Sequence, residues 1–119
     1  MTKLGCLLVV DPSAAAADRI AQNAKRVAKQ CRVATTIDDT CSIVEQCQPD
    51  LVVFSLQFGC TRILELAKAW KKHAQMLVVA TYAEMTPEVL SRLKKAGITE
   101  LLPQPIRLDD LFGIVSRHF

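Results

Sequence analysis

Aromatic residues and glycine are scarce in this chain of 119 residues, which contains 1 Trp, 1 Tyr, 4 Phe and 4 Gly. Half of the residues are nevertheless hydrophobic, and 23% are charged. This composition predicts a compact core of Leu, Ile, Val and Ala and argues against a disordered chain. The length is that of one domain, so we expect residues 1–119 to form a single domain, either alone or within a longer protein.

The chain also lacks a long apolar run. A membrane-spanning helix needs about 20 consecutive apolar residues, whereas the apolar run near the start covers only residues 4–10 and ends at Asp11. A secretory signal peptide needs a longer apolar region and a cleavage site of small residues. We therefore expect a cytoplasmic protein with no membrane partner.

The five cysteines include no CxxC pair and no flanking histidine pattern. Their odd number and spacing argue against a disulfide framework and against a zinc site. Cys6, Cys41 and Cys47 fall in apolar patterns, so we expect small core residues there. Cys60 falls in a predicted loop and is the candidate for an exposed, reactive thiol.

The net charge of +3 is mildly basic. The basic residues form three clusters, each placed on the polar side of a predicted helix and without interleaved aromatics. This pattern favours solvated helix faces over nucleic-acid binding. The clusters are Lys25, Arg26 and Lys29, then Lys68, Lys71 and Lys72, and then Arg92, Lys94 and Lys95.

Strand-like and helix-like segments alternate along the whole chain without a linker. Short continuous apolar runs predict buried strands, and apolar residues at helical spacing predict helices. The predicted strands are 4–10, 32–36, 51–55, 76–80 and 98–102, and the predicted helices are 14–29, 38–48, 63–70, 87–96 and 108–117. Strict alternation predicts an α/β fold: a doubly wound, flavodoxin-like parallel sheet of five strands in the order 2-1-3-4-5.

Ligand sites in such sheets lie beyond the carboxyl ends of the strands, where the strand order reverses. Four polar residues end or follow the predicted strands: Asp11, Ser55, Thr81 and Gln104. The topology therefore predicts that they share one crevice. Asp11 could also cap the first helix, Thr81 could bond to backbone, and Ser55 could bond to Gln104 or to water. Tyr82 follows on a predicted loop, as a contact residue or over the crevice.

Four segments lead to these positions: Leu-Leu-Val-Val-Asp at 7–11, Gln-Pro-Asp-Leu-Val-Val-Phe-Ser at 48–55, Leu-Val-Val-Ala-Thr at 77–81, and Ala-Gly-Ile-Thr-Glu-Leu-Leu-Pro-Gln-Pro at 96–105. Together they resemble the receiver domains of response regulators, the phospho-switches of two-component signalling, including the chemotaxis regulators. The resemblance covers essentially the whole chain. It implies that Asp11 matches an acid of the phosphorylation site, Thr81 its hydroxyl, and Pro105 a proline that often follows a cis peptide bond.

Three departures from the family pattern affect its chemistry. Pro12 stands where a second acid is expected, Ser55 where an aspartate accepts the phosphate, and Gln104 where a lysine is expected. The family's aromatic switch position falls on Leu101. The resemblance is therefore to a degenerate pseudo-receiver.

These departures are chemically consistent with one another. An acyl phosphate requires a carboxylate nucleophile, and a serine hydroxyl without a nearby base cannot replace it; both histidines, His73 and His118, are predicted at helix ends away from the crevice. Mg²⁺ favours carboxylate ligands, and only Asp11 remains. With two acids gone, a buried lysine would lack compensation, and Gln104 removes that charge. We expect no phosphorylation, no cofactor, lost or weak Mg²⁺ binding, and no enzymatic activity.

Two functions remain open. The first is a phosphorylation-independent module that binds a protein partner or forms a homodimer through the face of the fourth helix, fifth strand and fifth helix. Its candidate residues, Arg92, Lys95, Asp109 and Asp110, carry both charge signs, which suits a two-fold contact. The alternative is a small-ligand sensor in the emptied pocket or a redox sensor that uses Cys60.

Overall fold

The computed structural model describes residues 4–70 and 76–119; the predictions for Lys71, Lys72 and His73 lie outside these residues. Five parallel strands form one sheet in the order β2-β1-β3-β4-β5, so the predicted fold is confirmed. The strands are β1 (Leu4–Val10), β2 (Ala28–Ala34), β3 (Leu51–Ser55), β4 (Leu77–Tyr82) and β5 (Glu100–Pro103). The helices are α1 (Ala14–Ala24), α2 (Ile37–Cys47), α3 (Cys60–Ala69), α4 (Pro87–Lys95) and α5 (Leu108–His118), with a 3₁₀ turn at Leu56–Phe58.

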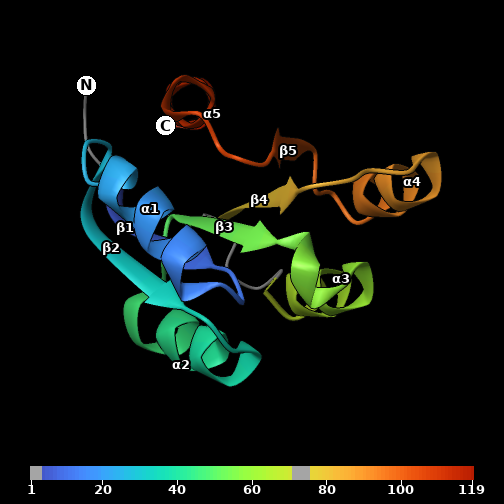
Figure 1. Cartoon of the computed structure of the whole chain (residues 1–119). Helices are drawn as coiled ribbons and strands as arrows, with labels where there is room; N and C mark the ends of the chain where they lie inside the picture. The colour runs from blue at the N-terminus through green and yellow to red at the C-terminus, as the bar shows by residue number, and fades with distance from the viewer. Residues whose placement is uncertain (1–3, 71–75) are drawn as a thin grey trace.

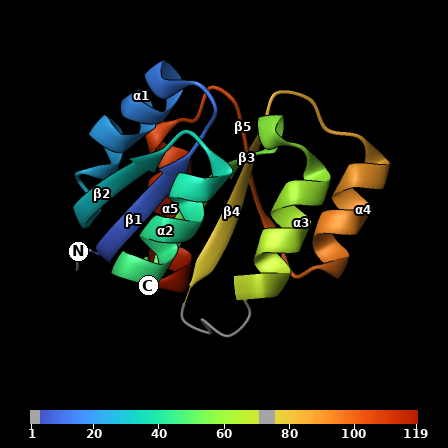
Figure 2. The same cartoon turned by 90° about the horizontal axis from the view of Figure 1, so that it is seen from below.

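The helices cover both faces of the sheet (Figure 1). Figure 2 shows α2 and α3 in front of the sheet and α5 behind it. Leu7 and Val9 of β1 belong to the core beneath α1 and α5, whereas Leu8 and Val10 belong to the core beneath α2, α3 and α4. Alternate residues of a strand point to opposite faces, so a strand buried on both faces has a continuous apolar sequence. This explains why β1 and β3 were easy to predict.

Hydroxyl side chains cap three of the helices. Ser13, Thr36 and Thr86 accept hydrogen bonds from the backbone N–H groups three residues ahead in α1, α2 and α4. Each bond satisfies one of the N–H groups that a helix start leaves without an intrahelical partner. Pro87 follows Thr86 as the first residue of α4, where a missing N–H costs nothing. The predicted start of this helix is confirmed.

The predicted first helix was too long. α1 ends at Ala24, and the N–H of Leu4 donates to the carbonyl of Val27 at 2.7 Å. β2 therefore begins at Ala28 and pairs with β1 along its full length. Val27 is buried in the same core as α1 although it lies outside the helix. Its apolar side chain therefore continued the helical spacing of the apolar residues in the sequence. Lys29, assigned to a helical basic cluster, lies on β2 instead.

Smaller differences affect residues near the site. Cys60 is the first residue of α3 rather than part of a loop, and it is half-buried against the core. β4 continues through Thr81 to Tyr82, so Tyr82 ends a strand rather than lying on a loop. β5 begins at Glu100 and ends at Pro103, two residues later than predicted at its start. No helix in the described part of the chain is long and apolar enough to cross a membrane.

Candidate functional site

The four polar residues of the predicted crevice lie at the carboxyl edge of the sheet. Ser55 is the last residue of β3 and pairs in register with Thr81 of β4. Asp11 directly follows β1, whose last residue, Val10, pairs with Phe54 of β3. Gln104 directly follows β5, and its N–H donates to the carbonyl of Tyr82 at 2.7 Å. The sheet register therefore fixes the backbone positions of all four.

Three of these residues form a neutral hydrogen-bond network. The Gln104 amide Nε2 donates to Thr81 Oγ1 at 3.0 Å and to Ser55 Oγ at 3.4 Å. Ser55 Oγ also accepts from the N–H of Gln57 at 3.1 Å. Ser55 and Thr81 are each 1% exposed, so these hydrogen bonds replace contacts with water. The prediction that Ser55 bonds to Gln104 is confirmed. The Thr81 hydroxyl was expected to bond to backbone, but among the described residues its hydrogen bond is with this same Gln104 side chain.

Asp11 lies outside this network. Its carboxylate is buried, with 2% exposure, and Oδ1 accepts a hydrogen bond from the N–H of Ser13 at 2.9 Å. Ser13, not Asp11, caps α1, so the alternative of a helix-capping Asp11 was wrong in detail. Asp11 holds the capping residue in place through the turn at Pro12, which is exposed.

The Gln104–Pro105 peptide bond is cis, as the resemblance implied for Pro105. Leu101 is half-buried and packs against the core beneath α4. Its aliphatic side chain has no polar atom, so it cannot form the hydrogen bonds that a switching tyrosine would make.

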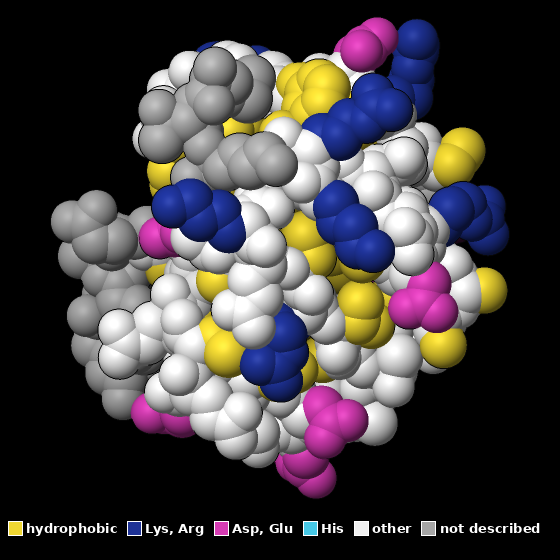
Figure 3. Space-filling model, turned by 90° about the vertical axis from the view of Figure 1, so that its left-hand side faces the viewer, with side chains coloured by type: hydrophobic (Ala, Val, Ile, Leu, Met, Phe, Trp, Pro, Cys, Tyr) yellow, Lys and Arg dark blue, Asp and Glu magenta, His cyan; other side chains and the backbone are white. Residues whose placement is uncertain are grey.

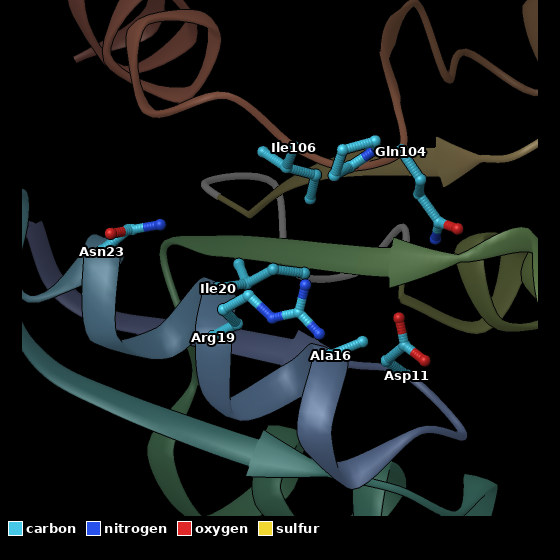
Figure 4. A pocket seen from close by; sticks show the side chains of 8 residues that line it. Asp11, Ala16, Arg19, Ile20, Asn23, Gln104 and Ile106 are labelled. Carbon is cyan, nitrogen blue, oxygen red and sulfur yellow. The ribbon is translucent and has the colours of Figure 1, made fainter.

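A cavity of about 300 Å³ opens beside Asp11, between α1 and residues 104–107, which connect β5 to α5. Figure 4 shows Asp11 rising from the end of β1 toward Gln104, with Arg19 and Ile20 of α1 on the same side. The lining residues are Asp11, Ala16, Arg19, Ile20, Asn23, Gln104, Pro105 and Ile106. Of the four residues predicted to share a crevice, Asp11 and Gln104 line this cavity, whereas Ser55 and Thr81 do not; its wall along α1 was not predicted.

Comparison with known proteins identifies the fold. No family model matches the chain, and no curated protein sequence matches it. The signal receiver domain of a DNA-binding response regulator (merR) from Colwellia psychrerythraea is 19% identical, with a TM-score of 0.82, over 95% of this chain and 96% of that one. A response regulator from Thermotoga maritima is 20% identical, with a TM-score of 0.82 and coverages of 98% and 97%. The chemotaxis protein CheY4 of Vibrio cholerae is 17% identical, with a TM-score of 0.83 and coverages of 98% and 99%.

This chain has the receiver-domain fold. The likeness extends over nearly the full length of these solved structures. Identities of this level establish the fold and leave the function to the site itself. The chemistry of Asp11, Ser55, Thr81 and Gln104 is therefore the basis for any functional conclusion.

The candidate interaction residues lie on two helices that flank β5 of the receiver fold (Figure 1). Asp109 and Asp110 are exposed in the first turn of α5. Arg92 and Lys95 are exposed on α4, where they line a groove with Leu64 and Lys68 of α3. In the described part of the chain none of the four predicted side chains forms an ion pair. They are available for intermolecular contacts, but the two basic residues lie nearer to α3 than the prediction assumed.

Sequence reasoning missed an ionic cluster at the opposite edge of the sheet. The Glu100 carboxylate accepts from Arg117 at 2.8 Å and lies 2.9 Å from Nε2 of His118. The hydrogen bond with His118, followed by that with Arg117, lowers the pKa of Glu100. The helical spacing of α5 places Arg117 and His118 in its last turn, but their partner on β5 could not be predicted from sequence.

The cysteines are all free thiols. Cys6 is buried as predicted, whereas Cys41 and Cys47 are only half-buried. Burial, followed by the nearby Cys47, raises the pKa of Cys6 to about 11. An Arg32 guanidinium nitrogen donates to Cys47 Sγ at 3.0 Å, a contact with no signal in the sequence.

The basic residues do not form one stripe on the side where α1, β2 and α2 lie. Figure 3 shows the Lys and Arg side chains of this side separated by neutral, hydrophobic and acidic ones. A nucleic-acid interface usually gathers its positive charge into a patch or stripe. This distribution supports the interpretation of solvated, separate cations.

Proposed function

We propose that this receiver-fold domain acts in signal transduction as a protein-binding module that works without phosphorylation. The observation that carries the proposal is the neutral network of Ser55, Thr81 and Gln104. These side chains satisfy one another through hydrogen bonds at 3.0 and 3.4 Å. A phosphorylation site would need a carboxylate at position 55 and a cation at position 104, and neither is present.

The chemistry of the remaining groups supports this proposal. An acyl phosphate forms by attack of a carboxylate, and Ser55 provides only a hydroxyl whose oxygen already accepts two hydrogen bonds. Of the two histidines, His118 belongs to the part of the chain that the structure describes. Its Nε2 lies 2.9 Å from a carboxylate oxygen of Glu100, so it provides no base for Ser55. Among the four crevice residues Asp11, Ser55, Thr81 and Gln104, Asp11 alone is a carboxylate, and a divalent Mg²⁺ ion usually needs further carboxylate or phosphate oxygens. We infer weak or absent Mg²⁺ binding and no catalysis by Ser55.

Protein binding would use the face formed by α4, β5 and α5. β5 is an edge strand of the sheet, and α4 and α5 flank it on opposite sides (Figure 1). A two-fold axis near β5 would bring α4 of one copy toward α5 of another. Arg92 and Lys95 would then approach Asp109 and Asp110 of the second copy, as a self-complementary interface requires. This arrangement favours a homodimer or a partner that presents the same charges.

The first experiment tests the loss of phosphorylation. Backbone amide NMR spectra are recorded with Mg²⁺ alone and then with beryllofluoride, a mimic of the acyl phosphate. We expect the peaks of Asp11, Ser55, Thr81 and Gln104 to stay in place. A matched variant that combines Pro12→Asp, Ser55→Asp and Gln104→Lys provides the positive control, because it supplies the missing acids and cation. Saturable shifts in the unmodified protein at millimolar Mg²⁺ and beryllofluoride would contradict the proposal.

The second experiment tests the interface. Sedimentation is measured for the unmodified chain, for Arg92→Glu with Lys95→Glu, for Asp109→Lys with Asp110→Lys, and for all four changes together. We expect each double variant to weaken self-association at least tenfold and the quadruple variant to restore it, because the charges are then exchanged. Arg62→Glu on α3, an exposed residue, is the control. A chain that stays monomeric at millimolar concentration would refute the homodimer and leave a different protein as the partner.

A further inference from the structure

We infer that the cavity between α1 and residues 104–107 is a binding site for a small aliphatic zwitterion, a molecule with a protonated amine at one end and a carboxylate at the other. This inference goes beyond protein binding and does not rest on it. The inner end of the cavity presents Asp11, and the helix α1 presents Arg19. Figure 4 shows both side chains on the cavity wall, with the Arg19 side chain extended from α1 toward the end of the cavity where Asp11 lies, and with Ile20 and then Asn23 farther along α1.

One face of α1 is spaced for this role. Ala16, Arg19, Ile20 and Asn23 stand at positions i, i+3, i+4 and i+7, so they share one side of the helix. The neighbouring side of α1 is packed on the sheet through its buried alanines. Ile20 lies on this side of the helix and is half-buried against the core, whereas a side of the helix that only contacts solvent would carry polar residues. This face therefore combines an apolar surface with two hydrogen-bonding side chains.

Asp11 indicates what binds at the inner end. Asp11 is 2% exposed, yet among the described residues its carboxylate accepts one hydrogen bond, from the N–H of Ser13. Within the described residues, no cation lies within ion-pair distance of it. A buried carboxylate without a counterion is costly. A protonated amine that enters the cavity would supply the missing charge and donate to the remaining oxygen.

Arg19 and Asn23 indicate what binds at the outer end. Both side chains are exposed on α1 at the rim of the cavity. Among the described residues, Arg19 forms no ion pair with a carboxylate, although Asp18 is adjacent in sequence. A guanidinium binds a carboxylate through two parallel N–H groups, and the amide of Asn23 can add a third donor. The outer end is thus suited to an anionic group.

The dimensions limit the ligand. A volume of about 300 Å³ corresponds to roughly ten water molecules at about 30 Å³ each. The stretch of helix from Ala16 to Asn23 rises by about 10 Å. Ile20, Pro105 and Ile106 give the cavity an apolar lining beside its charged groups, so the body of the ligand is aliphatic. A straight-chain amino acid such as 6-aminohexanoate satisfies the charge, length and volume requirements together.

Such a ligand would connect two parts of the fold. It would contact α1 on one side and Pro105 and Ile106 on the other. Residues 104–107 lead directly into α5, whose first turn carries Asp109 and Asp110. Ligand binding would therefore restrain the segment that positions the proposed interaction face.

The test is an amide NMR titration of the whole chain with 6-aminohexanoate. We expect saturable shifts at Ile20, Asn23, Gln104 and Ile106, with a Kd below about 1 mM. Hexanoate and hexylamine, which each keep one charged end, should bind at least tenfold more weakly, because a charged hydrogen bond is worth about a factor of ten or more. Equal binding of either analogue, or the absence of saturable shifts up to 10 mM, would overturn the inference.

Matched variants separate the site from the rest of the surface. Asp11→Asn keeps the hydrogen bond with Ser13, and Arg19→Gln changes an exposed residue, so both should fold; each should lower the affinity at least tenfold. Asp18→Asn and Arg26→Gln, exposed changes on or beside α1, should leave it unchanged. Unchanged affinity in Asp11→Asn or Arg19→Gln would refute the site. Failure of zwitterion binding would leave the beryllofluoride result untouched.

Discussion

The hydrogen-bond network at the end of the sheet makes a quantitative prediction about Gln104 and Thr81. The change Gln104→Leu removes the bonds at 3.0 Å to Thr81 and at 3.4 Å to Ser55. A hydrogen bond contributes about 1 kcal/mol net, and a buried group left without a partner costs about 1–3 kcal/mol. Ser55 keeps its bond from Gln57, so most of the cost falls on Thr81. We expect Gln104→Leu to lower the free energy of unfolding by about 2–3 kcal/mol.

The coupling energy between Gln104 and Thr81 tests the network more directly than the effect of either single variant. Thr81→Val alone should cost about 1 kcal/mol, because the half-exposed Gln104 amide can turn toward water. In the double variant the unsatisfied hydroxyl is gone, so the total should be about 2 kcal/mol rather than the sum of the single effects. The expected coupling energy is therefore about 1–2 kcal/mol, within the range for residues in contact.

The assay is urea unfolding of the four proteins in the double-mutant cycle, with the slope m checked for constancy. A matched control combines Gln104→Leu with Thr40→Val. Thr40 is also a fully buried threonine, but its hydroxyl donates to the carbonyl of Thr36, the residue that caps α2. That pair should be additive within about 0.5 kcal/mol. Additivity of Gln104→Leu with Thr81→Val to the same tolerance would refute the network as the structural basis of this site.

Three further predictions concern other parts of the fold. Thr86→Ala should destabilise the protein by about 1 kcal/mol in urea unfolding, because it removes the cap on α4; exposed Ser91→Ala on the same helix should not. Glu100 has a lowered pKa, so its contribution is present above its ordinary value of 4.5 and is lost as the pH falls through the folded value. The difference in stability between the protein and Glu100→Gln should accordingly vanish in acid, and it should stay below about 1 kcal/mol at pH 7 because its partners are exposed. With its pKa raised to about 11, Cys6 should react with iodoacetamide at pH 8 roughly 100-fold more slowly in the native protein than in urea.

The sequence predicted those parts of the fold that depend on local chemistry or on burial from both sides. β3 matches its predicted bounds because every one of its residues is buried, and α4 matches at its start because Thr86 and Pro87 are strong start signals. β2 was misplaced because it is an edge strand with exposed Lys29 and half-buried Arg32. Polar residues interrupt the apolar pattern of such a strand, and Val27 extended the helical pattern of α1 across the turn.

The composition of the crevice followed from topology alone, since parallel strands that end at one edge bring their last residues together. The partners of each side chain did not follow, because hydrogen bonds depend on rotamers and on distances of a few tenths of an ångström. The Gln104 amide donates to both Ser55 and Thr81, whereas the Asp11 carboxylate, at the end of β1, accepts from the N–H of Ser13. That division leaves neutral groups satisfied on one side of the crevice and a buried charge facing the cavity on the other. The zwitterion site that we propose depends on this division, because the cationic end of the ligand would pair with the buried carboxylate of Asp11.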